Sequence, residues 1–333
     1  MTKLIIQIPC LNEANYLPDT LRDLPVHIDG IDAIEVLVID DGSSDNTSEV
    51  AKNHGVQHIV RFKSNRGLAT AFSTGIDTAL KLGADYIVNT DADNQYSGSD
   101  INRLLAPLLR GEADIVIGDR NIRALGHMPP VKRWLQRFGS WVVRKVSNTR
   151  IPDTTSGFRA YSREAALRLT IVSEFSYTLE SIIQAGKRRM AITHVEVSTN
   201  KKTRESRLFD SITGYIRKSA VTIVRIYAMY EPLKIFSITG AITFGCGLVI
   251  SLRFLYYYFN GLGQGHLQSL ILSAVLLIVG FQIMLIGLIA DLSSANRKLT
   301  EEILYRLRSF ELLQHKKKSS DTNEREGKSA GEE

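Results

Sequence analysis

The segment ADYIVNTDADNQY (residues 84–96) ends an apolar run in two carboxylates one residue apart, Asp91 and Asp93. The β-branched residues before the acids predict a short buried strand. Carboxylates two positions apart in an extended segment lie on the same side, where one divalent cation can bind both. Mg²⁺ or Mn²⁺ is expected, because zinc prefers His and Cys ligands and neither lies nearby. The alternative is a capped turn between the strand and the next helix.

The flanking segments alternate between strand-like and helix-like patterns. Five apolar runs rich in Ile and Val predict strands at residues 4–9, 35–40, 58–62, 85–89 and 114–118. Helical patterns separate them at residues 16–24, 47–53, 68–81 and 99–109. This alternation predicts an α/β fold with a largely parallel sheet that is covered on both faces. In open sheets of this kind, ligands bind beyond the carboxyl ends of the strands.

Polar stretches follow three of the predicted strands: PCLNE (9–13), DDGSSDNT (40–47) and TDADNQY (90–96). A fourth stretch, NRGLA (65–69), leads into the third predicted helix. In this order and spacing, the four resemble the motifs of inverting family 2 glycosyltransferases of the Rossmann-like GT-A fold. No G-x-G-x-x-G pattern follows the first predicted strand, which disfavours a dinucleotide oxidoreductase.

A later segment restricts the resemblance to one group within these glycosyltransferases. DTTSGFRAYS (153–162) is similar to the Ser-Gly-Phe-Arg segment of polyprenyl-phosphate sugar transferases, the group that contains dolichyl-phosphate mannose synthases and bacterial undecaprenyl-phosphate glucosyltransferases. One departure is that Tyr96 and Ser97 stand where those sequences often carry Pro. The acceptor-side loop is therefore expected to differ.

The resemblance implies roles on the donor side. The divalent ion would neutralise the leaving diphosphate of a nucleotide sugar, with Asp91, Asp93 and Gln95 as its ligands. Nucleotide-sugar contacts are implied for Pro9, Asn12, Glu13, Asp40, Asp41, Arg66, Gly67 and Ala92. The competing interpretation of DDGSSDNT is a turn with a helix N-cap, and that of Arg66-Gly67 is plain helix capping.

On the acceptor side, the resemblance implies a polyprenyl phosphate. Its phosphate carries about −1.5 to −2 charges at neutral pH, so a strong general base is unnecessary. Asp153 is a catalytic candidate that would orient the acceptor or close the site, unless it caps a turn after Pro152. The candidates for binding the acceptor phosphate are Arg159 first, then Arg204, Arg207, Lys132 and Arg133.

Two long uncharged segments predict a transmembrane hairpin. Residues 235–252 and 267–290 hold no Asp, Glu, Lys or Arg, and about 20 such residues span a bilayer. The connecting loop, 260–266, also lacks Lys and Arg, whereas basic residues flank both outer ends. The positive-inside rule therefore predicts cytoplasmic termini and a cytoplasmic catalytic domain at a bacterial inner or plasma membrane. Gly240, Gly245 and Gly247 are candidates for close helix packing.

Basic amphipathic segments complete the organisation. Residues 130–148 and 207–230 interleave cations with apolar side chains, a pattern typical of helices in the headgroup layer. Plain solvated surfaces are the alternative, and no motif supports nucleic-acid binding. The predicted domains are a GT-A domain (1–205), a juxtamembrane helix (206–232), transmembrane helices (233–259 and 267–292), an amphipathic helix (293–315) and a disordered tail (316–333).

The predicted activity is metal-dependent, inverting transfer of a hexose, with UDP-glucose as the favoured donor, onto undecaprenyl or another polyprenyl phosphate. A GDP-mannose-dependent transferase and a membrane-tethered nucleotide-sugar-binding subunit without activity are the alternatives. A processive polysaccharide synthase is disfavoured, because it needs more membrane spans and a Gln-x-x-Arg-Trp segment. Self-association into a homo-oligomer is also expected.

Overall fold

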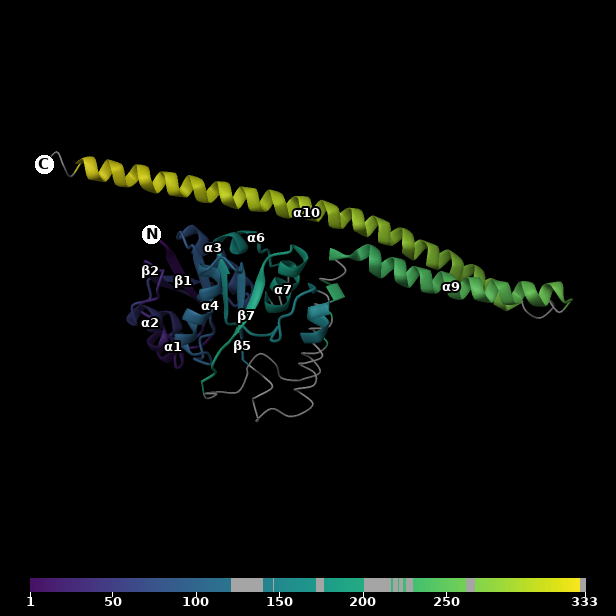
Figure 1. Ribbon diagram of the computed structural model, residues 1–333, viewed down its shortest axis with the longest axis horizontal. Coiled ribbons are helices and arrows are strands. Elements are labelled where there is room, and N and C mark those ends of the chain that lie inside the picture. The colour runs from purple at the N-terminus through teal and green to yellow at the C-terminus, as the bar shows by residue number, and fades with distance from the viewer. Residues whose placement is uncertain are drawn as a thin grey trace. The chain divides into compact units, whose positions relative to one another are not determined.

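The computed structural model describes residues 1–120, 140–145, 147–171, 177–200, 230–261 and 267–329, together with 217, 221, 224 and 225. It divides into two compact units. One comprises residues 1–223 and 304–333, and the other residues 224–303. The first unit holds a sheet flanked by helices, and the second holds the two long apolar helices (Figure 1).

A seven-stranded sheet with the order β3-β2-β1-β4-β6-β5-β7 forms the centre of the first unit. Its strands are β1 (Lys3–Cys10), β2 (Ala33–Asp40), β3 (His58–Arg61), β4 (Tyr86–Asn89), β5 (Ile115–Asp119), β6 (Arg159–Ser162) and β7 (Ile192–Glu196). All neighbouring pairs are parallel except those of β6, which runs antiparallel to both β4 and β5. The predicted α/β class with a mostly parallel sheet is confirmed.

Helices cover both faces of the sheet (Figure 1). They are α1 (Leu17–Asp23), α2 (Thr47–Asn53), α3 (Leu68–Lys81), α4 (Ile101–Leu109), α6 (Arg163–Arg168) and α7 (Tyr177–Lys187), with a 3-10 turn η1 (Gly98–Asp100) before α4. Leu4, Ile6 and Ile8 of β1 pack in one core with Leu17 of α1 and Leu104 of α4. On the opposite face, α3 approaches β1 so closely that a Cβ on its Gly75 would contact Gln7.

Alternation of side chains along β1 explains this double cover. Residues 4, 6 and 8 project to the α1/α4 face, so the intervening positions project to the α3 face. Because both faces are covered, the central strands read as continuous apolar runs, and all five predicted strands are present. The two strands that the sequence pattern missed, β6 and β7, lie beyond residue 150.

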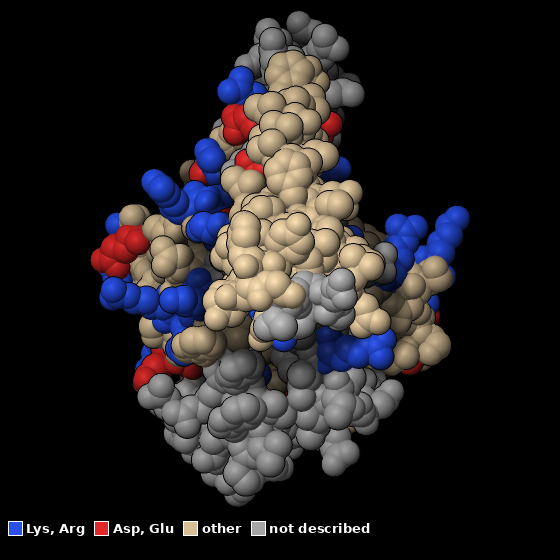
Figure 2. Space-filling view, turned by 90° about the vertical axis from the view of Figure 1, so that its right-hand side faces the viewer, with Lys and Arg blue, Asp and Glu red and all other residues tan. Residues whose placement is uncertain are grey.

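The second unit is a helical hairpin. It contains α9 (Pro232–Phe259) and the start of α10 (Leu267–Ser329), both long and apolar enough to cross a membrane. Figure 2, which looks onto the end of this hairpin, shows a surface with few charged side chains. A Cβ on Gly240 would lie 2.6 Å from the Met284 side chain, and one on Gly247 would lie 2.9 Å from the Leu277 backbone nitrogen. Gly245, by contrast, meets nothing within 4 Å, so close packing uses two of the three predicted glycines.

Helix α10 does not stop where the predicted domains divide it. Residues 267–292, 293–315 and most of 316–333 were expected to be a span, a separate helix and a disordered tail, but the helix runs unbroken to Ser329. Between Gly287 and Gly327 the segment contains no Gly or Pro to interrupt it. Within the first unit, Tyr305 and Arg308 of this helix form hydrogen bonds to Glu164 and to the Leu169 carbonyl.

Candidate active site

The polar stretches of the sequence meet at one edge of the sheet. Strands β2, β1 and β4 are parallel neighbours, and Cys10 pairs with Asp40 at the end of the β1–β2 register. The stretches after these strands, which contain Asn12, Asp41 and Asp91, therefore leave the same edge. This confirms that the motifs gather at the carboxyl ends of the strands, where ligands bind in such sheets.

The loops after β1 and β2 are tied to each other by hydrogen bonds. The Asn12 N–H donates to Ser43 Oγ at 2.9 Å, and Asn12 Oδ1 accepts the Ser44 N–H at 2.8 Å. Next to it, the Glu13 N–H donates to Thr47 Oγ1 at 2.9 Å. Asn12 has a positive φ of 56°, a conformation that Asn tolerates better than most residues. These contacts place Asn12 and Glu13 beside the DDGSSDNT stretch. The nucleotide-sugar contacts of Pro9, Asn12 and Glu13 stay a prediction.

Asp40 and Asp41 are both buried and hydrogen-bonded. Asp40 accepts the Ser43 N–H at 2.8 Å and the Ser48 hydroxyl, and lies 3.4 Å from Arg61 Nε. Asp41 accepts two backbone N–H groups, from Arg66 at 2.7 Å and Gly67 at 2.9 Å. The two carboxylates thus organise the loops at this edge.

Gly67 is the N-cap residue of α3 and has a φ of 90°, which favours glycine. The Arg66 guanidinium lies 5.2 Å from the centroid of the Phe62 ring, on an exposed part of the loop. The N-terminus of α3 therefore adjoins the Asp41 carboxylate. Its position relative to a bound phosphate stays a prediction.

The Asp-x-Asp segment is a turn, which corrects the expectation of an extended chain. The backbone turns at residues 92–93, and Asn94 has a φ of 51°. Thr20 of α1 holds this turn, since its hydroxyl donates to the Ala92 carbonyl and accepts the Asn94 N–H, each at 2.9 Å. Asp93 Oδ1 accepts the Gln95 N–H at 3.2 Å. Turn geometry wins here because Asn at a left-handed position lets the chain reverse directly after β4.

Asp91 lies against the Ser-Gly-Phe-Arg segment. A Cβ on Gly157 would lie 2.9 and 3.2 Å from the two Asp91 carboxylate oxygens and 3.0 Å from the Tyr177 hydroxyl. Asn89 orders this corner, because its Nδ2 donates to the Gly157 carbonyl at 2.8 Å and to the Tyr177 hydroxyl at 3.1 Å. Tyr177 is itself buried and stacks on Phe72, with ring centroids 4.0 Å apart. The Asp91 carboxylate therefore occupies a closely packed position.

Asp153 forms a buried ion pair with Arg120, which follows β5. Arg120 Nε lies 2.7 Å from Asp153 Oδ2, and Arg120 Nη2 donates to Asp153 Oδ1 at 3.1 Å and to Thr155 Oγ1 at 2.9 Å. Burial alone would raise the pKa of Asp153, but Arg120 and the hydrogen bonds from Thr155 lower it overall. The predicted catalytic Asp153 is thus engaged with Arg120, a residue that the sequence patterns did not single out.

Tyr96 lies near both Asp91 and Asp153. It is buried, its ring stacks on Phe158 at 4.9 Å, and its hydroxyl accepts the Gly157 N–H at 3.3 Å. Burial raises the pKa of Tyr96 to about 12; Arg120 opposes this rise, while the charges of Asp91 and Asp153 add to it. The neutral phenol therefore persists at physiological pH. Tyr96, which stands in the stretch where related sequences often carry Pro, therefore packs against Gly157 beside Asp91.

Arg159, the first candidate for binding the acceptor phosphate, is fully buried. Its guanidinium donates to the carbonyls of Ser156 (2.7 Å), Thr178 (2.9 Å) and Thr154 (3.0 Å), and to Ser181 Oγ (2.7 Å). These bonds connect the 154–156 segment to α7. The other four candidates, Arg204, Arg207, Lys132 and Arg133, lie outside the described residues.

Comparison with known proteins places this arrangement in a family. Residues 5–170 match the model of glycosyl transferase family 2. An uncharacterized glycosyltransferase of Mycobacterium tuberculosis strain H37Rv is 30% identical over 224 residues, which cover 66% of this chain and 94% of the relative. The chain belongs to glycosyl transferase family 2. The undecaprenyl-phosphate mannosyltransferase of Micrococcus luteus is 27% identical over 237 residues, or 68% of this chain and 96% of the relative.

Solved structures of a glucosyl-3-phosphoglycerate synthase share the fold. Glucosyl-3-phosphoglycerate synthase from Mycobacterium tuberculosis, crystallised with Mn²⁺, UDP and glucosyl-3-phosphoglycerate, superposes with a TM-score of 0.55. The match covers 68% of this chain and 80% of that one, at 20% sequence identity. The same synthase has also been solved with Mg²⁺ and UDP. The likeness confirms the GT-A fold.

The donor atoms at the family 2 Asp-x-Asp turn fit a Mg²⁺ or Mn²⁺ ion. Asp91 and Asp93 are partly exposed on one short turn, Gln95 follows two residues later, and the side chains of all three offer oxygen ligands. In the described part of the chain, no group of three or more His, Cys, Asp or Glu forms a complete metal cage. Two carboxylates that leave positions for phosphate oxygens and water are what Mg²⁺ requires at nucleotide sites.

Proposed function

We propose that this family 2 protein is a membrane-anchored, inverting glycosyltransferase that moves one hexose from a nucleotide sugar onto a polyprenyl phosphate. The observation that carries the proposal is the Asp91–Asp93 turn, which leaves the same sheet edge as the Asn12 and Asp41 loops. A nucleotide between these loops would direct its diphosphate toward the two carboxylates. The two apolar helices supply the membrane setting of the acceptor.

On the donor side, Asp91, Asp93 and Gln95 would hold the divalent ion, and that ion neutralises charge on the departing diphosphate. Asn89 and Tyr177 order the corner beside Asp91, and Thr20 holds the turn that contains Asp93. The loops after β1 and β2 would bind the nucleoside. The buried residues Gly157 and Tyr177 lie beside the partly exposed Asp91 carboxylate and would orient it before the donor arrives.

The transfer step needs little proton chemistry. An oxygen of the acceptor phosphate attacks the anomeric carbon from the face opposite the diphosphate, the carbon–oxygen bond to the diphosphate breaks, and the configuration inverts. Since the phosphate already carries about −1.5 to −2 charges at pH 7, it needs no strong general base. Asp153 and Arg120 neutralise each other beside this site and hold the 153–155 segment. The acceptor phosphate is assigned to cations of the basic segments, with Arg204 and Arg207 as the leading candidates.

UDP-glucose is the favoured donor. The sequence similarity to undecaprenyl-phosphate glucosyltransferases supports glucose, and UDP occupies the structural neighbour with the same fold. GDP-mannose is the alternative, supported by the similarity to the undecaprenyl-phosphate mannosyltransferase of Micrococcus luteus. A non-catalytic subunit that binds nucleotide sugar without transfer is the second alternative. The proposed orientation keeps both termini and the catalytic unit in the cytoplasm.

The decisive experiment uses the full chain in nanodiscs that contain undecaprenyl phosphate. Labelled UDP-glucose, GDP-mannose or UDP-N-acetylglucosamine is added with Mn²⁺, with Mg²⁺ or with EDTA, and label in the organic phase is measured. One donor should yield labelled lipid, and EDTA should abolish the product. Donor binding without lipid product from any donor would instead support the non-catalytic subunit.

Isosteric variants test the metal assignment. Asp91→Asn and Asp93→Asn each remove one charge without changing side-chain size, and we expect each to lower turnover by at least about a hundredfold. Asp29→Asn is the matched control, because Asp29 is fully exposed outside the site. Thermal unfolding of all three should match that of the unmodified protein. Near-normal turnover in Asp91→Asn would remove this residue from the metal site.

A further inference from the structure

A short helical segment at residues 140–145 and 147 packs firmly on the catalytic unit. Its inward residues Ser140, Val143 and Ser147 are buried at helical spacing. A Cβ on Gly186 of α7 would overlap the Ser147 carbonyl oxygen, so the two backbones are in direct contact. The outward face of this segment is therefore held on a rigid support.

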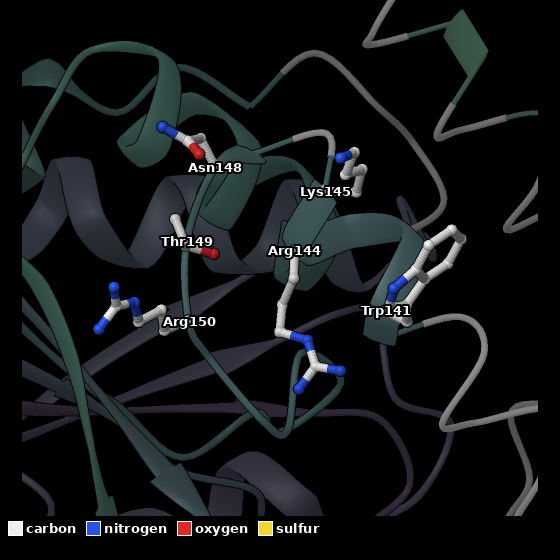
Figure 3. Close-up of a pocket in the computed structure, with 6 residues that line it drawn as sticks. All are labelled: Trp141, Arg144, Lys145, Asn148, Thr149 and Arg150. Carbon is white, nitrogen blue, oxygen red and sulfur yellow. The ribbon is translucent and has the colours of Figure 1, made fainter.

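That outward face forms a basic hollow of about 390 Å³. Figure 3 shows the residues around it, with the Arg144 and Arg150 side chains flanking Thr149 and the Trp141 indole at one end of the group. The lining comprises Trp141, Arg144, Lys145, Asn148, Thr149 and Arg150, and so includes three cations and no acid. Trp141 is 54% exposed, which is unusual for so large an apolar side chain.

The three cations differ from several arginines elsewhere in the described structure. Arg120, Arg168 and Arg308 each form an ion pair with a carboxylate. Within the described ranges, by contrast, the side chains of Arg144, Lys145 and Arg150 take part in no ion pair or hydrogen bond that would balance their charge. Three like charges around one hollow repel each other unless an anion occupies it. The charge distribution therefore favours an anionic ligand.

We propose that this basic hollow binds the phosphate headgroup of an anionic membrane phospholipid. Guanidinium groups bind phosphate oxygens through paired, charge-assisted hydrogen bonds, and an ammonium group adds a third contact. An exposed indole beside them suits the boundary between headgroups and acyl chains, where Trp is enriched. A free anion would explain the cations but not the indole, and the same chain carries two helices able to cross a bilayer.

This lipid site is distinct from the proposed acceptor site. A bilayer phospholipid is a phosphodiester, which stays bound as a structural ligand and takes no part in transfer. The basic hollow contains none of the residues to which the acceptor phosphate was assigned. Its role would be to hold this face of the catalytic unit on an anionic membrane. This proposal does not depend on the donor assignment.

The test uses Trp141 itself as the reporter. The chain has two tryptophans, so Trp134→Phe leaves Trp141 as the sole indole. The full-length variant is placed in nanodiscs of phosphatidylcholine with increasing fractions of phosphatidylglycerol, and acrylamide quenching of Trp141 is measured. We expect quenching to fall as the anionic fraction rises. Neutralising the hollow with Arg144→Gln, Lys145→Gln and Arg150→Gln together should abolish that fall.

Controls separate the lipid site from general attraction. Arg22→Gln, Lys52→Gln and Arg110→Gln together remove the same charge from exposed positions outside the hollow and should leave the quenching response intact. The proposal is overturned if the hollow variant responds to phosphatidylglycerol as the unmodified protein does. If inorganic phosphate in pure phosphatidylcholine discs, at matched ionic strength, protected Trp141 from quenching as well as phosphatidylglycerol does, the hollow would be a small-anion site. Displacement of phosphatidylglycerol by undecaprenyl phosphate would make it part of the acceptor site, and either result overturns the lipid assignment.

Discussion

Replacing Gly157 by alanine tests how the fold holds the Asp91 carboxylate. The added Cβ would lie 2.9 Å from one Asp91 oxygen and 3.0 Å from the Tyr177 hydroxyl, each several tenths of an ångström inside normal contact. Tyr177 has little freedom to move, because it stacks on Phe72 at 4.0 Å and accepts a hydrogen bond from Asn89. The partly exposed carboxylate of Asp91 is the group that must shift.

The size of the effect follows from this displacement. Introducing a methyl group into a packed site costs about 1–3 kcal/mol of folding stability. A shift of the carboxylate approaching 1 Å misplaces the metal ligand and should lower turnover by about tenfold to a hundredfold. Because Asp91 would also bind the ion less well, the Mn²⁺ concentration for half-maximal activity should rise. Gly157 has no positive φ, so backbone strain adds nothing to this expectation.

The assay measures transfer to undecaprenyl phosphate across a Mn²⁺ titration, alongside thermal unfolding of the full chain. Gly111→Ala is the control: Gly111 has a φ of 69° with no neighbour within 4 Å, so its substitution strains the backbone without touching the site. It should lower stability while its metal dependence stays unchanged. A Gly157→Ala protein with normal turnover and normal Mn²⁺ dependence would refute the reasoning.

Three other expectations concern the ion pairs of the catalytic unit. Arg120→Ala leaves the Asp153 carboxylate, only 1% exposed, without its partner. It should reduce the free energy of unfolding by about 3–5 kcal/mol in a denaturant titration. An unchanged free energy of unfolding would show that water replaces the guanidinium. Because the folded pKa of Asp153 is lowered, the pair stabilises the protein above the unfolded pKa of about 3.9, and that stability is lost as pH falls through the folded value. Asp153→Asn should therefore flatten the acid side of a stability–pH curve, and an unchanged slope below about pH 4 would contradict the assignment. Arg308→Ala removes a 3.1 Å ion pair with Asp77. Amide exchange in residues 304–312 of α10 should become about fivefold faster if the ion pair contributes about 1 kcal/mol to local stability. Leu307→Ala, at an exposed position of the same helix, should leave this exchange unchanged.

Much of the fold was accessible from local pattern. Buried parallel strands are continuous apolar runs, so β1, β2, β3, β4 and β5 were predicted close to their observed positions. Turn chemistry at the strand ends marked the stretches around Asn12, Asp41 and Asp91. These signals are short-range, and four of them in fixed order were enough to indicate the family.

The antiparallel strand β6 was not predictable in this way. It has four residues, and its place between β4 and β5 is set by pairing with strands more than 40 residues away in sequence. That pairing brings Gly157 against Asp91 and positions Asp153 near Arg120. No local pattern contains this information, because the contacts form only once the sheet has assembled.

By itself, the sequence determined the order of the polar stretches along the chain, the presence of the Asp-x-Asp motif after β4 and the two apolar helices, since each depends on neighbouring residues. The turn that the motif adopts was decided by the tertiary structure. Tertiary structure alone decided which charged side chains are available to bind a ligand. Arg159 looks like a phosphate ligand in the sequence, yet it is buried with four hydrogen bonds to its own fold, whereas Arg144 and Arg150 remain without a carboxylate partner in the described structure. The physical reason is that burial and pairing of a charge depend on groups distant in the chain, whose approach only the folded sheet brings about.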